Sequence, residues 1–163
     1  MSAIIYATVT RAPDSMKNFL IIPAFVLPIA RNNPIWERCL LHFIQNVPVI
    51  PKNAQQMKNI KFVGLHFHIG SQILEMDDFV ALCNRVNELQ EVLLKHHIVC
   101  EHINVGGGLG IDYHHPNHFP IPNFADFFAT YHKHLHLLPG QTLHFELGRA
   151  VVAQCGSLIS RVT

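Results

Sequence analysis

Apolar residues recur at helical spacing in three stretches of the chain. The first covers residues 35–46 and ends before Pro48. The second, residues 76–96, has two acidic residues in its first turn, where the helix dipole favours negative charge. The third covers residues 124–137, and Asn123 is placed to cap it. The apolar positions of the three are Ile35, Cys39, Leu40, Phe43, Ile44 and Val47; Phe79, Leu82, Val86, Leu89 and Leu93; and Phe124, Phe127, Phe128, Tyr131 and Leu135. We expect amphipathic helices that turn these faces to a core.

Short apolar runs precede, separate and follow the last two helical stretches, at residues 61–67, 100–105 and 142–146. Runs of this length are typical of buried strands. Strands that alternate with helices favour a parallel sheet, because each helix returns the chain to the start of the next strand. The predicted fold class is therefore α/β.

Each predicted strand runs into a motif rich in glycine or polar residues, namely GLHFHIGSQ (64–72), NVGGGLGIDY (104–113) and FELGRAVV (145–152). His68 and Gly106 are 38 residues apart, and so are Gly108 and Glu146. This interval suits one strand, loop and helix. Three such units, each with its chemistry at the carboxyl end of a strand, indicate part of a (β/α)8 barrel, which usually needs about 250 residues.

The first 34 residues carry no clean helical or strand period and four of the ten prolines. We leave residues 1–34 unassigned and expect residues 35–163 to form the C-terminal half of a barrel domain, about its strands six to eight. Apolar residues make up 49% of the chain and charged residues 14%, which suits a buried segment of a larger fold.

A formal net charge of +1 gives no indication of a nucleic-acid partner. The longest apolar run, residues 19–30, is interrupted by Pro23 and Pro28 and is too short for the roughly 20 residues of a membrane span. The four cysteines are scattered and form no CxxC pair, which favours reduced thiols in the cytoplasm over a disulfide framework.

Gly106, Gly107 and Gly108 follow a predicted strand, where backbone N–H groups without a neighbouring Cβ can approach an anion such as a phosphate. A simple flexible turn is the alternative. Glu146 and Arg149 also follow a strand. They either pair with each other or hold a ligand, with Glu146 on a cationic ring nitrogen and Arg149 on a carboxylate or phosphate.

His66 and His68 alternate along a strand and so share one face. An HxH pair on a strand can bind a metal, although one packed histidine and one functional histidine fit equally well. His68 can lie flat against a planar cofactor, and the Ser71 hydroxyl can donate to a phosphate. His96, His97, His132, His134 and His136 lie near predicted helix ends, and His114, His115 and His118 lie in a predicted loop. We expect these eight to be surface residues.

Together the three motifs, in this order and spacing, resemble the fold-type III pyridoxal-phosphate decarboxylases, and within them the diaminopimelate decarboxylase group. The resemblance covers about residues 60–163. It implies the cofactor pyridoxal 5′-phosphate, and the reaction it implies is decarboxylation of meso-diaminopimelate to L-lysine. It also implies a small amino-acid substrate, a cytoplasmic homodimer, and no nucleic-acid or membrane partner.

The same resemblance implies a role for each motif residue. His68 would stack on the pyridine ring, and Ser71 with the three glycines at 106–108 would hold the phosphate. Glu146 would pair with the pyridine nitrogen. Arg149, next to Leu147 and Gly148 in the same cofactor-binding motif, would lie near the phosphate and the substrate carboxylate.

The chain departs from the family pattern in several places. Leu147 stands where the family usually has proline, and residues 1–34 do not resemble the family segment. None of the lysines lies in a context that matches the family's Schiff-base lysine, and the C-terminal β-domain that completes the substrate site has no counterpart. We therefore expect the isolated chain to be inactive, with no catalytic residue of its own. An open half-barrel also exposes sheet edges, which predicts poor solubility or oligomerisation.

Three alternatives remain. One is a related fold-type III decarboxylase or racemase acting on another amino acid. Another is a metal-dependent barrel hydrolase that uses His66 and His68. The last is a non-enzymatic remnant that binds pyridoxal phosphate weakly or not at all.

Overall fold

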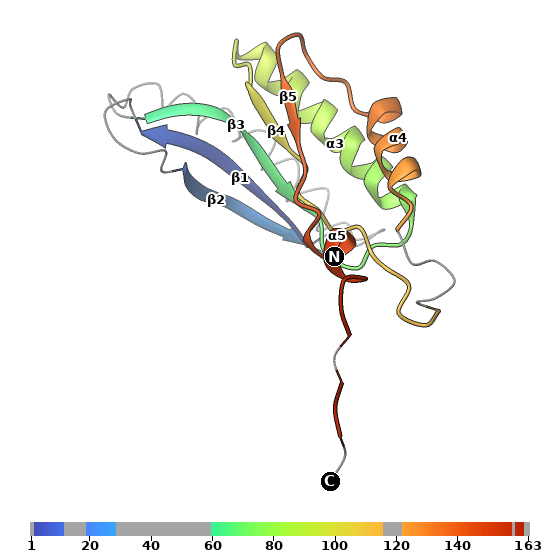
Figure 1. Ribbon diagram of the computed structural model, residues 1–163. Coiled ribbons are helices and arrows are strands. Elements are labelled where there is room, and N and C mark those ends of the chain that lie inside the picture. The colour runs from blue at the N-terminus through green and yellow to red at the C-terminus, as the bar shows by residue number, and fades with distance from the viewer. Residues whose placement is uncertain (1, 12–18, 29–59, 116–121, 158, 162–163) are drawn as a thin grey trace.

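A computed structural model of the chain describes residues 2–11, 19–28, 60–115, 122–157 and 159–161. The helix expected over residues 35–46 lies outside this part. The elements in chain order are β1 (Ser2–Arg11), β2 (Phe19–Pro28), β3 (Ile60–His68), α3 (Met76–Lys95), β4 (His102–Asn104), α4 (Phe124–His134), β5 (Thr142–His144) and α5 (Gly148–Val152). From β3 onward, the predicted succession of strands and helices is confirmed (Figure 1).

The five strands form one sheet in the order β2-β1-β3-β4-β5. β3, β4 and β5 run parallel, and Gly64, His102 and Thr142 stand side by side at the start of the paired region. The parallel sheet expected from the alternation is therefore confirmed. β4 and β5 are shorter than the predicted strands, because the chain leaves the ladder after Asn104 and His144 to form the loops described below.

The first two strands form an antiparallel hairpin that the sequence did not predict. β1 pairs antiparallel with β2 on one side and with β3 on the other, so the sheet is mixed (Figure 1). β2 is the edge strand and contains Pro23, and an edge position tolerates proline because that residue has no N–H to give to a further strand. The pairing of β1 with β2 shifts register between Ile5 and Tyr6, next to the partner of this proline.

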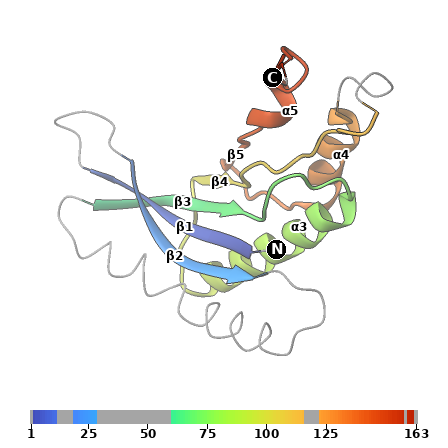
Figure 2. The same ribbon diagram turned by 90° about the horizontal axis from the view of Figure 1, so that it is seen from below.

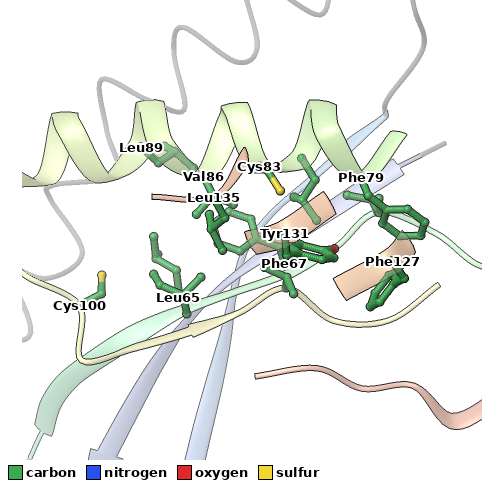
Figure 3. Close-up of a cluster of buried hydrophobic side chains, with 14 of the residues drawn as sticks. Leu65, Phe67, Phe79, Cys83, Val86, Leu89, Cys100, Phe127, Tyr131 and Leu135 are labelled. Carbon is green, nitrogen blue, oxygen red and sulfur yellow. The ribbon is translucent and has the colours of Figure 1, made fainter. Parts of the chain in front are cut away.

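α3 and α4 pack together on one face of the parallel strands (Figure 2). The predicted stripe of α3 is buried, from Phe79 at 0% exposure to Leu82 at 5%. It meets the inward residues of β3, such as Leu65 and Phe67, and those of α4 (Figure 3). Phe79 and Phe127 make an edge-to-face contact with ring centroids 4.9 Å apart, which joins the two helices.

α4 follows its prediction with two differences. Asn123 caps the helix as expected, since its Oδ1 accepts from the backbone N–H of Asp126 at 3.1 Å. The helix ends at His134 rather than at 137, because Leu135 is extended. Phe127 and Tyr131 are buried, but Phe128, which was expected to face inward, is 39% exposed at the margin of the core.

The opposite face of the parallel strands carries polar side chains. Since side chains alternate along a strand, the burial of Leu65, Ile103 and Leu143 against the helices places the intervening residues on the other face. Those residues are His66 and His68 on β3, His102 and Asn104 on β4, and Thr142 and His144 on β5. Helices on one face and inward-facing chemistry on the other form the arrangement of a barrel segment. Among the described helices, none combines the length and the apolar character that crossing a bilayer requires.

Candidate functional site

The three motifs meet at one edge of the sheet, where the parallel strands β3, β4 and β5 end (Figure 1). Backbone hydrogen bonds join the loops that follow them. The Ile73 N–H donates to the Gly108 carbonyl at 2.8 Å, and the Gly110 N–H donates to the Ile73 carbonyl at 2.9 Å. The Glu146 N–H donates to the Gly106 carbonyl at 2.7 Å. The loop of Gly106, Gly107 and Gly108 after β4, called the glycine loop below, is therefore bonded to Glu146 of the third motif and to Ile73, which directly follows the first motif.

The three glycines allow this close approach. A Cβ on Gly107 would lie 2.1 Å from the Glu146 carbonyl oxygen, and one on Gly106 would lie 2.3 Å from that of Phe67. Gly106 and Gly108 also have φ of +70° and +101°, in the region that glycine adopts at least cost. The flexible-turn alternative does not describe this loop, because backbone from both flanking motifs fixes it.

Glu146 lies on the polar face with its side chain about half exposed. Its two carboxylate oxygens have different neighbours. Oε1 accepts from the Nδ2 of Asn104 at 2.9 Å, and Oε2 lies 3.5 Å from the Nε2 of His66. The carboxylate is thus held from two strands and still presents an open side.

His66 is the buried member of the HxH pair, and its side chain is 11% exposed. Burial lowers the pKa of His66 from its ordinary value of 6.5, and the nearby Glu146 carboxylate partly opposes this shift. A neutral imidazole can donate from Nε2 to the carboxylate. His66 is therefore the packed histidine of the pair and lies against Glu146.

His68 is the available member, half-buried at the end of β3. Its ring lies against the glycine loop, since its Nδ1 is 3.2 Å from the position that a Cβ on Gly106 would take. Ser71 is exposed in the loop that follows. The structure therefore brings the predicted residues of the first two motifs to the same edge as Glu146.

Arg149 is exposed in α5 and does not reach Glu146 in the contacts that the structure records. Its Nη1 donates to the Oε1 of Gln72 at 3.1 Å, and its guanidinium carbon is 6.0 Å from the centre of the Tyr113 ring. Leu147 precedes α5 as its N-cap residue, and Gly148 is the first residue of the helix. Of the two alternatives for Glu146 and Arg149, the structure does not record the mutual pair, and Arg149 is instead linked to Gln72 of the first motif.

Two residues of the site, Asn104 and Gln72, were not singled out from the sequence. Asn104 bonds Glu146 and the glycine loop, and Gln72 bonds Arg149 and the backbone of Ile111. A usable signal existed for Asn104, because it alternates with His102 on the polar face of a predicted strand.

The residues of the site do not form a metal centre in the part of the chain that is described. No group of three or more histidine, cysteine, aspartate or glutamate side chains there is placed to hold a metal ion. His66, one of the two ligands that the hydrolase alternative requires, instead lies against Glu146.

Comparison with known proteins identifies the region that contains the site. Residues 41–153 match the family model described as the pyridoxal binding domain of the pyridoxal-dependent decarboxylases. The diaminopimelate decarboxylase of Bacteroides thetaiotaomicron is 71% identical over 109 residues, which are 67% of this chain and 28% of that protein. The diaminopimelate decarboxylase of Neisseria meningitidis serogroup B is 35% identical over 111 residues, 67% of this chain and 25% of that protein.

Solved structures agree on the fold. A crystal structure from Aquifex aeolicus superposes with a TM-score of 0.54 at 30% identity, over 66% of this chain and 26% of that one. The structure of the diaminopimelate decarboxylase of Helicobacter pylori, solved with L-lysine, superposes with a TM-score of 0.56 at 24% identity, also over 66% of this chain and 26% of that one. The chain thus spans about a quarter of the length of the relatives that it matches.

Proposed function

The chain belongs to the family of pyridoxal-dependent decarboxylases, and we propose that it supplies part of the cofactor site of an enzyme that converts meso-diaminopimelate to L-lysine. The observation that carries this proposal is the meeting of His68, Glu146 and the glycine loop at one edge of the sheet. The 71% identity to a diaminopimelate decarboxylase supports that substrate over those of related decarboxylases and racemases.

The residues present fit pyridoxal 5′-phosphate. Glu146 offers a half-exposed carboxylate to the protonated nitrogen of a pyridine ring, and His68 offers a flat imidazole beside it. The loop of Gly106, Gly107 and Gly108 lies at the same edge of the sheet, where the backbone N–H groups of a glycine-rich loop suit a phosphate. When bound, the cofactor supplies an electron-accepting ring that stabilises negative charge on the substrate carbon as carbon dioxide leaves.

Each residue then has a role that its position supports. Glu146 keeps a proton on the ring nitrogen, because an ionised carboxylate favours the charged form of its partner. His68 fixes the plane of the ring, and Ser71 donates its hydroxyl to the phosphate together with the glycine backbone. Arg149, held by Gln72, provides positive charge for the phosphate or the substrate carboxylate.

We propose that the 163-residue chain is inactive by itself. The described lysines with a defined side chain, Lys95 and Lys133, lie in the last turns of α3 and α4. Because these helices run antiparallel to the strands, their last turns lie at the opposite edge of the sheet from Glu146. Neither lysine can therefore replace the family's Schiff-base lysine.

The remaining features of the complete protein are also proposals. Residues 35–163 would form the C-terminal half of the barrel domain, which the family match over residues 41–153 supports. The complete enzyme would act as a cytoplasmic homodimer on a small amino acid. The unpaired thiols of Cys83, Cys100 and Cys155 support a reducing compartment, and the net charge of +1 supports the absence of a nucleic-acid partner.

A chimera tests the activity. The 109-residue stretch shared with the Bacteroides thetaiotaomicron enzyme is exchanged for the corresponding stretch of this chain, and release of carbon dioxide is measured. We expect decarboxylation of meso-diaminopimelate and not of ornithine. In the same chimera Glu146→Gln should lower kcat, because a neutral amide holds the ring proton less well. A folded chimera that loads the cofactor but releases no carbon dioxide from diaminopimelate would contradict the proposal.

Borohydride reduction tests the isolated chain. The chain is mixed with pyridoxal 5′-phosphate and reduced, and the labelled peptides are mapped by mass. We expect no label, or a diffuse label over several lysines. Stoichiometric labelling of one lysine would show that a substitute exists and that the chain is not half of a site.

A further inference from the structure

Asn104 joins the two halves of the cofactor site through a single side chain. Its Nδ2 donates to the Oε1 of Glu146 at 2.9 Å, and its Oδ1 accepts from the backbone N–H of Gly106 at 2.8 Å. One contact reaches the carboxylate proposed for the ring nitrogen. The other reaches the first glycine of the loop proposed for the phosphate.

The chemistry of these two partners fixes the orientation of the amide. A carboxylate only accepts hydrogen bonds and a backbone N–H only donates them, so the Nδ2 of Asn104 must face Glu146 and its Oδ1 must face Gly106. The reverse orientation would set oxygen against oxygen and N–H against N–H. An asparagine satisfies both partners at once, whereas aspartate or leucine at the same position cannot.

The place of Asn104 in the sheet suits this task. It is the last residue of β4, the strand between β3 and β5, and its register partners are His66 on one side and His144 on the other (Figure 1). The side chain is half-buried on the polar face. His66 of β3 approaches the other carboxylate oxygen of Glu146, so this carboxylate, which follows β5, is contacted from both β4 and β3.

We propose that Asn104 is a positioning residue that sets the distance and orientation between the Glu146 carboxylate and the glycine loop, so that the ring nitrogen and the phosphate of one cofactor molecule are held together. The proposal rests on the proposed function for the identity of the ligand. It adds that the two ends of the site are coupled through this amide and are not independent.

Two substitutions separate the two contacts. Asn104→Asp keeps an oxygen for the Gly106 N–H but places a second carboxylate against Glu146, where like charges repel. Asn104→Leu has a similar shape and removes both contacts. Asn87→Asp is the matched control, because the Asn87 side chain also bridges two backbone groups: it donates to the His134 carbonyl at 2.8 Å and accepts from the His136 N–H at 2.9 Å. Asn87 lies in α3, away from the site.

The affinity of each variant is measured by calorimetry for pyridoxal 5′-phosphate and for its 1-deaza analogue, whose ring has no nitrogen for Glu146. The preference is the affinity for pyridoxal 5′-phosphate divided by the affinity for the analogue. We expect Asn104→Asp to lower this ratio about tenfold, as for loss of a charged hydrogen bond, and to leave the affinity for the analogue unchanged. Asn104→Leu should lower the affinity for both compounds about tenfold. Asn87→Asp should change neither.

Hydrogen exchange at the Gly106 amide, followed by mass spectrometry with fragmentation to single residues, gives a readout that needs no ligand. Exchange should be about tenfold faster in Asn104→Leu and unchanged in Asn104→Asp, since only the former loses the acceptor. Wild-type exchange and wild-type affinities in Asn104→Leu would overturn the proposal. An equal fall in the affinity for both compounds in Asn104→Asp would also overturn it.

The two readouts also separate this inference from the proposed function. If the wild-type chain binds neither compound, the proposed cofactor site fails, and exchange at Gly106 alone decides whether Asn104 holds the loop. If Asn104→Leu does not fold, the result for Asn104→Asp decides. A lower ratio of the two affinities with wild-type exchange at the Gly106 amide supports the proposal, and an unchanged ratio overturns it.

Discussion

Arg149 and Gln72 are 77 residues apart in the chain and are joined by a hydrogen bond of 3.1 Å from Nη1 to Oε1. The same oxygen accepts from the Ile111 N–H at 3.3 Å, and the Nε2 of Gln72 donates to the Ile111 carbonyl. Gln72 therefore contacts both other motifs. It does so from a backbone with φ of +60°, which is costly for a residue with a side chain.

Removing the Gln72 side chain should destabilise the site as a whole. Gln72→Ala leaves the buried backbone groups of Ile111 without these partners and keeps the unfavourable φ, so we expect a loss of about 1–3 kcal/mol of unfolding free energy. Urea denaturation measures it. Gln154→Ala, at an exposed glutamine, is the control and should change stability by less than about 0.5 kcal/mol. Equal effects at the two positions would argue against a structural role for Gln72.

The glycine loop should not tolerate even one added methyl group. A Cβ on Gly107 would overlap the Glu146 carbonyl, so Gly107→Ala must displace one of the two motifs. We expect a loss of more than about 3 kcal/mol, or a chain that does not fold cooperatively, in thermal unfolding followed by circular dichroism. The control is Gly140→Ala, because Gly140 has a φ of +83° but open space around it, whereas Gly107 has an ordinary φ and a blocked Cβ position. It should cost only about 1 kcal/mol. A loss at Gly107 no larger than that at Gly140 would mean that the contact with the Glu146 carbonyl does not fix the loop.

The sequence predicted the parts of the fold that local patterns encode. The stripe of α3 and the cap at Asn123 follow from periodicity and side-chain chemistry within a few residues, and both are confirmed. The meeting of His68 with Glu146 was predictable as well, because parallel strands bring their carboxyl ends to one edge. The prediction that Phe128 faces the core was wrong, because its exposure depends on how far the core extends beyond α4.

Longer-range relationships could not be predicted in this way. The hydrogen bond from Asn104 to Glu146 spans 42 residues, and its existence depends on the register of β4 against β5. The hairpin of β1 and β2 was also not predicted. A proline such as Pro23 argues against a strand unless the strand is known to lie at the edge of a sheet, and the sequence alone does not show which strand is at the edge. The tertiary contacts that fix register and edges are absent from any short window of sequence.

His66 should make the stability of the chain depend on pH. Its pKa is lower in the folded chain than the ordinary 6.5, chiefly through burial, so the unfolded chain binds a proton more readily. The contribution of His66 to stability is therefore complete above pH 6.5 and declines as pH falls toward the folded pKa. The Glu146 carboxylate and His68 are the charged or titratable neighbours that act on it.

The corresponding measurement compares unfolding free energies between about pH 7.5 and pH 5.5, a range above the ordinary carboxylate pKa. We expect the wild-type chain to lose stability across this range more steeply than His66→Gln. The exposed His132, replaced in the same way, should leave the wild-type slope unchanged. A slope in His66→Gln as steep as in the wild type would contradict the assignment.

The three described cysteines should differ sharply in reactivity. Cys83 and Cys100 are buried, and burial raises the pKa of each thiol to about 12, whereas Cys155 is exposed in the segment after α5. At pH 8 a thiol of pKa about 12 is ionised in about one molecule in ten thousand, and only the thiolate reacts with iodoacetamide.

Among the described cysteines, we expect iodoacetamide to label Cys155 rapidly and the other two slowly. Peptide mapping identifies the labelled residue and separates any label on Cys39, which lies outside the described residues. Cys155→Ser should remove the fast phase, and urea should expose Cys83 and Cys100 together if α3 and β4 share one cooperative core. Fast labelling of Cys83 in the native chain would mean that α3 is not closed against the sheet, and the edge that holds Glu146, Asn104 and the glycine loop would then lack its rigid support.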